Sequence, residues 1–101
     1  MKDIQMLSDM IEEEIEDAGK YAKRALEYKE TNPAMADTFF KLANEEIGHA
    51  DSLHKQVMML VSEYKKTVGE PPADMLAIYK YIHGKHIDKL SEVKVKLSLY
   101  K

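Results

Sequence analysis

Apolar residues recur along the chain in alternating steps of three and four, the repeat of a helix that buries one side. The first such repeat runs through Ile4, Leu7, Ile11, Glu14, Ala18, Tyr21, Ala25 and Tyr28. The second runs through Phe39, Leu42, Glu46, His49, Leu53, Gln56 and Leu60. The third runs through Leu76, Tyr79, His83, His86, Leu90, Val93, Leu97 and Tyr100. The pattern therefore predicts three amphipathic helices.

Proline and glycine divide the chain between these repeats. Asn32 before Pro33 reads as a helix cap followed by the first helical residue. Gly69 followed by Pro71 and Pro72 reads as a helix end and a restart. We predict helices over about 3–30, 33–68 and 72–101, within a single domain over 1–101. Because both connections are short, we expect an all-α, up-down-up antiparallel three-helix bundle.

Composition narrows the classes of function. The 101 residues are 33% charged and 45% hydrophobic with a net charge of -3, which gives no electrostatic reason to expect nucleic acid or an anionic membrane as a partner. No apolar run approaches the length of a membrane span, and the first residues lack an apolar leader, so we expect a cytoplasmic protein. The absence of cysteine leaves only oxygen and nitrogen ligands for any metal.

In the first two apolar repeats, two carboxylates and one histidine occupy positions expected to be apolar, namely Glu14, Glu46 and His49. A buried charge must be paired, neutralised or bound to a metal. Glu14 lies 18 residues before Asn32, and Glu46 and His49 lie 14 and 17 residues after it. In an antiparallel hairpin folded there, the three side chains face one another at nearly the same height. The sequence therefore predicts either a metal site or buried polar groups that set the pairing of the helices.

Glu14 with Tyr21 seven positions on, followed by Glu46-x-x-His49, resembles one half of the ferritin-like di-iron proteins, which include ferritins, rubrerythrins and encapsulated ferritin-like proteins. The chain is also similar to small ferritin-like proteins encoded by bacteriophages. The resemblance covers residues 4 to about 64. It implies that Glu14 and Glu46 are carboxylate ligands, that His49 is the nitrogen ligand, and that iron is the metal, with manganese or zinc as alternatives.

The second half of the family's ligand set is missing, because the third helix has no Glu-x-x-His. Two copies related by a two-fold axis would supply Glu14, Glu46 and His49 twice. We therefore expect a homodimer, or a higher homo-oligomer, with a ferritin-like four-helix core and two iron ions at its interface. The resemblance implies ferroxidase or peroxide-scavenging activity, although turnover stays uncertain, and iron storage would require a further assembly or an encapsulating shell.

Several residues keep two interpretations. Tyr21 is either a catalytic residue whose hydroxyl reaches the ligand or a carboxylate, or an aromatic that fills the edge of the core. His83 and His86 are extra ligands, partners of a carboxylate or proton carriers; alternatively, they are half-buried histidines hydrogen-bonded where the third helix packs.

Other polar residues read as solvated. Asp51-x-x-His54 has ligand-like spacing but is expected on the surface. Glu12, Glu13 and Glu16 are expected on an acidic solvent face, with Glu13 the strongest exception. Gly19 and Gly48 suggest close helix approach, and Gly84 suggests either close packing or a slight bend of the third helix.

Two competing functions remain open. One is a non-catalytic helical dimer, such as an adaptor or phage accessory protein, in which Glu14, Glu46 and His49 pair with each other or with lysines. The other is a structural divalent metal site that locks a dimer without redox chemistry.

Overall fold

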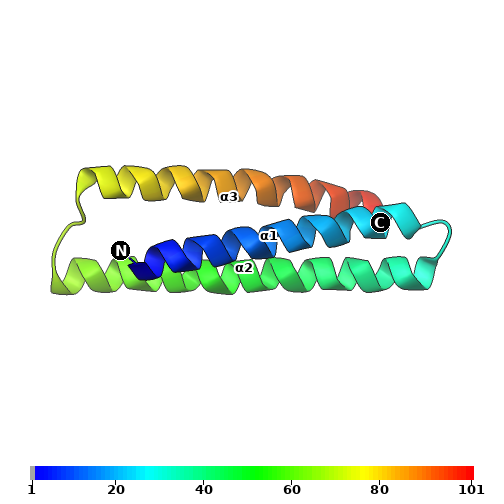
Figure 1. Cartoon of the computed structure of the whole chain (residues 1–101), viewed down its shortest axis with the longest axis horizontal. Coiled ribbons are helices and arrows are strands. Elements are labelled where there is room, and N and C mark those ends of the chain that lie inside the picture. Colours follow the sequence, from blue (N-terminus) through cyan, green and yellow to red (C-terminus); the bar gives the residue numbers. More distant parts are fainter. Residues whose placement is uncertain (1) are drawn as a thin grey trace.

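The computed structural model describes residues 2–101, which form three α-helices and no strand (Figure 1). The helices are α1 (Lys2–Tyr28), α2 (Pro33–Thr67) and α3 (Ala73–Tyr100). They run side by side along a body of 55 × 18 × 18 Å. The predicted helix ends differ from the observed ends by at most two residues, and the all-helical prediction is confirmed. None of the helices described over 2–101 combines the length and apolarity that crossing a bilayer requires.

The two connections follow the local chemistry of the sequence. The Asn32 side chain accepts a hydrogen bond from the Met35 backbone N–H at 3.2 Å, and Pro33 occupies the first turn of α2. At the other end of α2, Gly69 has a φ of 121° and its N–H donates to the Tyr64 carbonyl at 3.1 Å. A positive φ favours glycine, so this residue ends the helix as predicted.

Alanines form the seam between α1 and α2. The side chains concerned are exposed by 3% or less, and they are Ala18, Ala22, Ala25, Ala36, Ala43 and Ala50. On α2 the buried line continues at intervals of seven residues to Val57. Small side chains on facing helices let the backbones approach closely, and longer side chains beside the seam can then meet across it.

This alanine seam corrects the predicted orientation of α2. We expected Glu46 and His49 at core positions, but in the single chain they lie beside the buried line of Ala43 and Ala50. Glu46 is half-buried and His49 is exposed. On α2, the predicted repeat of larger side chains and the buried repeat of alanines are offset by only a few residues. The larger side chains gave the stronger hydrophobic signal, so the prediction followed them instead of the alanines.

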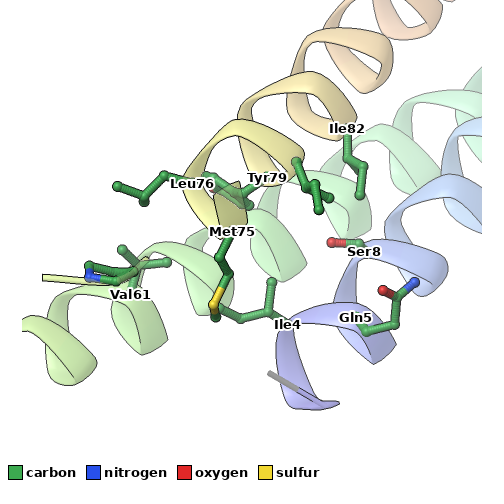
Figure 2. Close-up of a pocket in the computed structure, with 10 residues that line it drawn as sticks. Ile4, Gln5, Ser8, Val61, Met75, Leu76, Tyr79 and Ile82 are labelled. Atoms are coloured by element: carbon green, nitrogen blue, oxygen red, sulfur yellow. The ribbon is translucent and has the colours of Figure 1, made fainter. Parts of the chain in front are cut away.

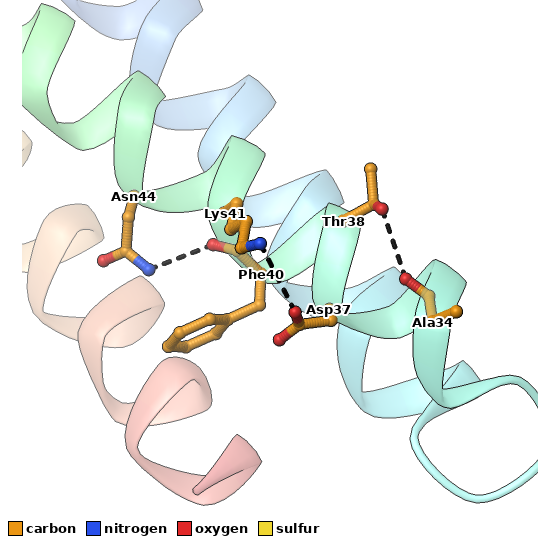
Figure 3. Close-up of polar contacts among 6 residues, drawn as sticks. All are labelled: Ala34, Asp37, Thr38, Phe40, Lys41 and Asn44. Carbon is orange, nitrogen blue, oxygen red and sulfur yellow. Dashed lines mark hydrogen bonds and ion pairs between the residues drawn. The ribbon is translucent and has the colours of Figure 1, made fainter.

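α3 packs mostly against α1, and its backbone comes close to that of α2 at few places. Val93 of α3 lies against Gly19 of α1, and Lys89 of α3 pairs with Glu12. On α2, Figure 3 shows the Phe40 ring directed toward α3, where it stacks on Tyr100 with ring centroids 4.7 Å apart. We call this side of the α1–α2 hairpin the covered face.

The opposite side of the hairpin, which we call the open face, carries Glu14, Tyr21, Phe39, Glu46 and His49. None of these residues contributes to the described α3 contacts through Gly19, Glu12 or Phe40. The two faces therefore have different surroundings within a single chain.

Polar side chains on the outer surface of α2 bond within their own helix (Figure 3). Thr38 Oγ1 donates to the Ala34 carbonyl at 3.2 Å, and the Asn44 side-chain amide donates to the Phe40 carbonyl at 3.0 Å. Lys41 lies 3.6 Å from Asp37, one turn away. Such contacts stabilise a solvated helix surface only modestly and do not form a ligand site.

Candidate metal centre

The open face brings together the three residues that the sequence singled out. Glu14 comes from α1, and Glu46 and His49 come from α2, one helical turn apart. Each offers a donor atom, and these atoms lie within 4.8 Å of one another. His49 Nδ1 is 3.5 Å from a Glu14 carboxylate oxygen and 3.7 Å from a Glu46 carboxylate oxygen. Over residues 2–101, this is the one group of three histidine, aspartate or glutamate residues that approaches so closely.

The antiparallel hairpin explains why these residues meet. Glu14 and the Glu46-x-x-His49 pair lie at similar distances from the turn at Asn32, so they reach the same height on facing helices. Residues three apart on a helix share one side, which places both α2 donors toward Glu14. The alanine seam beneath them holds α1 and α2 close.

The cluster is only partly shielded from water. The side chains of Glu14 and Glu46 are 25% and 18% exposed, and that of His49 is 60% exposed. The separations of 3.5 and 3.7 Å exceed those of a good charged hydrogen bond, which are about 2.7–2.9 Å. An ion pair at such distances with an exposed histidine contributes little to stability. The three groups are thus close to one another without being tightly paired.

Tyr21 is a half-buried aromatic that lies two helical turns from Glu14 along α1. Its ring stacks on Phe39 with centroids 6.2 Å apart. The Tyr28 ring also stacks on Phe39, with centroids 6.3 Å apart. This packing matches the interpretation of Tyr21 as an aromatic at the edge of the α1–α2 seam. A catalytic role for its hydroxyl stays a prediction.

Apolar side chains flank the cluster along the open face. Met10 lies one turn before Glu14 and is 40% exposed. Leu42 lies one turn before Glu46, and Leu53 lies one turn after His49, and both are half-buried. The cluster therefore sits within an apolar stripe that the single chain leaves partly in water.

A second group of polar residues lies on the covered face, and the sequence predicted it only in part. The His54 ring stacks on His83 with centroids 4.3 Å apart and planes 9° apart. His86, one turn along α3, is only 8% exposed. The prediction that Asp51-x-x-His54 is solvated is correct for Asp51, which pairs with Lys55 at 3.3 Å, but wrong for His54, which is half-buried.

A signal for His54 was present in the sequence. It lies midway in a stripe at intervals of seven residues that contains Phe40, Ile47, His54 and Val61, all partly buried. One of the two interpretations of His83 and His86 was that they are half-buried and hydrogen-bonded to tyrosine or glutamate side chains where α3 packs. Instead, His83 lies between the rings of His54 and Tyr79, with the Tyr79 centroid 6.1 Å away.

Burial shifts the protonation of this second group. Burial lowers the pKa of His54, and the neighbouring His83 lowers it further. Burial is also the largest cause that lowers the pKa of His86, opposed by the charge of Glu12. Both imidazoles therefore favour the neutral form near neutral pH.

Glu12 corrects the expected acidic solvent face. Its carboxylate accepts a hydrogen bond from Lys89 Nζ at 2.5 Å, and this bond lowers the pKa of Glu12 and raises that of Lys89. Glu13, expected to be the exception, is exposed. Position 12 faces α3 because α3 lies along the covered face, which the α1 sequence alone does not indicate.

The glycines do not mark close helix approach as expected. A Cβ added at Gly19 would lie 3.6 Å from Val93, an ordinary contact. A Cβ added at Gly48 or Gly84 would meet nothing within 4 Å. The prediction is therefore wrong for Gly48 and Gly84 within the single chain.

A small cavity of about 210 Å³ lies where the start of α3 meets the hairpin. Figure 2 shows Met75, Leu76 and Tyr79 of α3 near Ile4 and Val61. The lining is mainly apolar, and burial raises the pKa of Tyr79. This gap holds no group of metal-ligating side chains, so the candidate chemistry stays with the histidine and glutamate clusters.

No family model, curated protein or solved structure matches the chain. The ferritin-like resemblance therefore stays a prediction.

Proposed function

We propose that the protein binds a pair of iron ions between two copies of the chain and acts as a ferroxidase or peroxide scavenger. The observation that carries this proposal is the convergence of Glu14, Glu46 and His49 donor atoms within 4.8 Å on the open face. Carboxylate and imidazole donors together suit iron, and they also suit manganese or zinc.

The number of donors supports a homodimer. Three residues are too few to ligate two metal ions, whereas a two-fold pair of chains offers four carboxylates and two imidazoles. The apolar side chains beside the cluster, including Met10, Leu42 and Leu53, give a second copy a surface on which to pack. Two hairpins joined in this way would form the ferritin-like four-helix core, with α3 outside it.

Charge indicates how such a dimer depends on metal. Four carboxylates brought into one interface repel each other, and their desolvation costs further free energy. Two divalent cations would balance four negative charges, and the two histidines would serve as nitrogen donors. We therefore expect association of the two chains to be stronger with metal than without it.

The residues of the cluster have distinct roles in this proposal. Glu14 and Glu46 would hold the metal pair with their carboxylates, which favour the oxidised ferric state, and His49 would supply the nitrogen ligand. An iron pair bound there supplies two electrons for the reduction of oxygen or peroxide. The stacked rings of Tyr21 and Phe39 lie two helical turns from Glu14 and Glu46, toward the turn at Asn32.

The alternative of a non-catalytic dimer predicts that the three side chains satisfy one another. The separations of 3.5 and 3.7 Å from His49 to the carboxylates do bring them together without metal, and this observation keeps the alternative in view. It explains the cluster less well, because exposed pairs at those distances add little stability. A structural divalent site without redox chemistry would share the ligands and differ only in turnover.

One experiment separates these functions. Protein purified without chelators is analysed for metal content, loaded with Fe(II) under anaerobic conditions and then exposed to oxygen. The proposal predicts bound iron and oxygen consumption coupled to iron oxidation. Bound metal without oxidation would favour the structural site, and the absence of bound metal at every concentration would favour the non-catalytic dimer.

A further inference from the structure

Three of the chain's four histidines gather between α2 and α3. His54 comes from α2, and His83 and His86 come from α3. They line one groove of about 360 Å³ on the covered face, on the other side of α2 from His49. The Glu14–Glu46–His49 cluster makes no use of them.

Imidazole rings from two helices lie side by side here, although their nitrogen atoms do not converge within 4.8 Å as the donors of the open face do. The His54 and His83 rings lie face to face with centroids 4.3 Å apart. His86 follows His83 by three residues, so the two extend from one side of α3. His86 is 8% exposed, and the other two rings are half-buried. Burial limits the competition of bulk water for their nitrogen atoms.

The charged groups around the imidazoles have partners of their own. On α2, Asp51 pairs with Lys55 at 3.3 Å, and between α1 and α3, Glu12 pairs with Lys89. Lys94 of α3 also lines the groove. The His54 ring stacks on His83 at 4.3 Å, and burial there favours a neutral His54 imidazole with a free nitrogen lone pair. The lowered pKa values of His54 and His86 agree with this.

We propose that His54, His83 and His86 form a second metal site, which takes a divalent ion of the zinc class between α2 and α3. Neutral imidazole is a preferred zinc ligand, bound at about 2.0–2.1 Å. Stacked rings present their faces to each other, so binding requires them to turn until their nitrogen atoms point to a common centre. The groove beside the rings provides the space for this rotation, and it leaves a fourth position for water or a carboxylate.

The ion would join two helices whose backbones come close at few places, since α3 packs mostly on α1. Binding to the folded chain alone stabilises it, so the thermal midpoint should rise with metal concentration. This proposal does not depend on iron chemistry at the open face.

The test uses a Glu46→Ala/His49→Ala background, which removes two of the three open-face donors and leaves the covered face intact. Zn²⁺ is titrated by calorimetry near neutral pH, and Co²⁺ is added as an optical probe of tetrahedral nitrogen coordination. We expect about one Zn²⁺ per chain and visible Co²⁺ bands. Replacing His54 or His83 by glutamine in that background should weaken Zn²⁺ binding at least tenfold, because a ligand is lost. Lys94→Gln, which alters the same groove without removing an imidazole, should leave the affinity unchanged.

Absence of Zn²⁺ binding in the background protein, or binding that survives both histidine substitutions, would overturn the proposal. Circular dichroism checks that each variant is helical. If either histidine variant fails to fold, imidazole ¹⁵N chemical shifts measured in the background protein test the same ligand assignment. Ligation must shift the nitrogen signals of His54 and His83 upon addition of Zn²⁺, and unchanged signals would contradict it.

Discussion

The two long faces of the α1–α2 hairpin carry two different kinds of polar cluster. On the open face, two carboxylates and an exposed imidazole converge beside apolar side chains. On the covered face, three imidazoles from α2 and α3 line one groove, and the nearby carboxylates of Asp51 and Glu12 pair with lysines. The first cluster combines two carboxylates with one imidazole, whereas in the second burial lowers the pKa of His54 and His86. The difference shows how one helix, α2, can present separate chemistry on its two sides.

The largest expected effect comes from removing one carboxylate of the open face. Glu46→Ala should weaken metal binding at least about 100-fold, because loss of a direct ligand costs no less than loss of a supporting partner. Calorimetric titration with Fe(II) under anaerobic conditions measures the change. Glu45→Ala is the matched control, since Glu45 is the adjacent carboxylate and is exposed. Equal affinities for the two variants would refute the ligand assignment.

The alanine seam that supports both faces gives the next effect. Ala43→Leu places a large side chain where the exposed fraction is 0%, and overpacking should lower the free energy of unfolding by about 1–3 kcal/mol. Urea denaturation followed by circular dichroism measures it. The same change at exposed Ala77 on α3 should cost far less. Similar losses at both positions would show that the seam is not tightly packed.

Acid should weaken the covered face in particular. His54 has a folded-state pKa below its ordinary value of 6.5, so the unfolded chain binds protons more readily. The histidine contribution to stability is therefore complete above pH 6.5 and declines as the pH falls below it, until the folded-state pKa is passed. His86 acts in the same direction. Thermal midpoints measured across this range should fall with acid, and the fall should be shallower in His54→Gln. An identical pH profile in that variant would contradict the assignment.

The smallest effect concerns a glycine that neither face requires. Gly84→Ala should stabilise the chain by about 0.5–1 kcal/mol, because alanine loses less conformational entropy in a helix and its Cβ meets nothing within 4 Å. Urea denaturation detects the gain. A loss of stability would indicate that another surface, such as a second copy, packs against Gly84.

The sequence predicted the helices and their ends well, because Asn32, Pro33 and Gly69 have strong local preferences. It also predicted that Glu14, Glu46 and His49 would meet, because their heights follow from counting residues on either side of one turn. The core register of α2 was predicted wrongly, since Ala36, Ala43 and Ala50 form the buried line and alanine gives a weak hydrophobic signal. The burial of His54 and the pairing of Glu12 depend on where α3 packs against the hairpin, and tertiary contacts determine that position.

Native mass spectrometry tests the central claim most directly, because it reports the number of chains and the number of bound ions in one complex. The measurement uses Fe(II)-loaded protein carrying His54→Gln, so that ions at the covered face do not enter the count. The account predicts a dimer with two iron ions, reduced to a metal-free species when Glu46 is also replaced by alanine. Monomers at every iron concentration, or dimers that carry no iron, would contradict it.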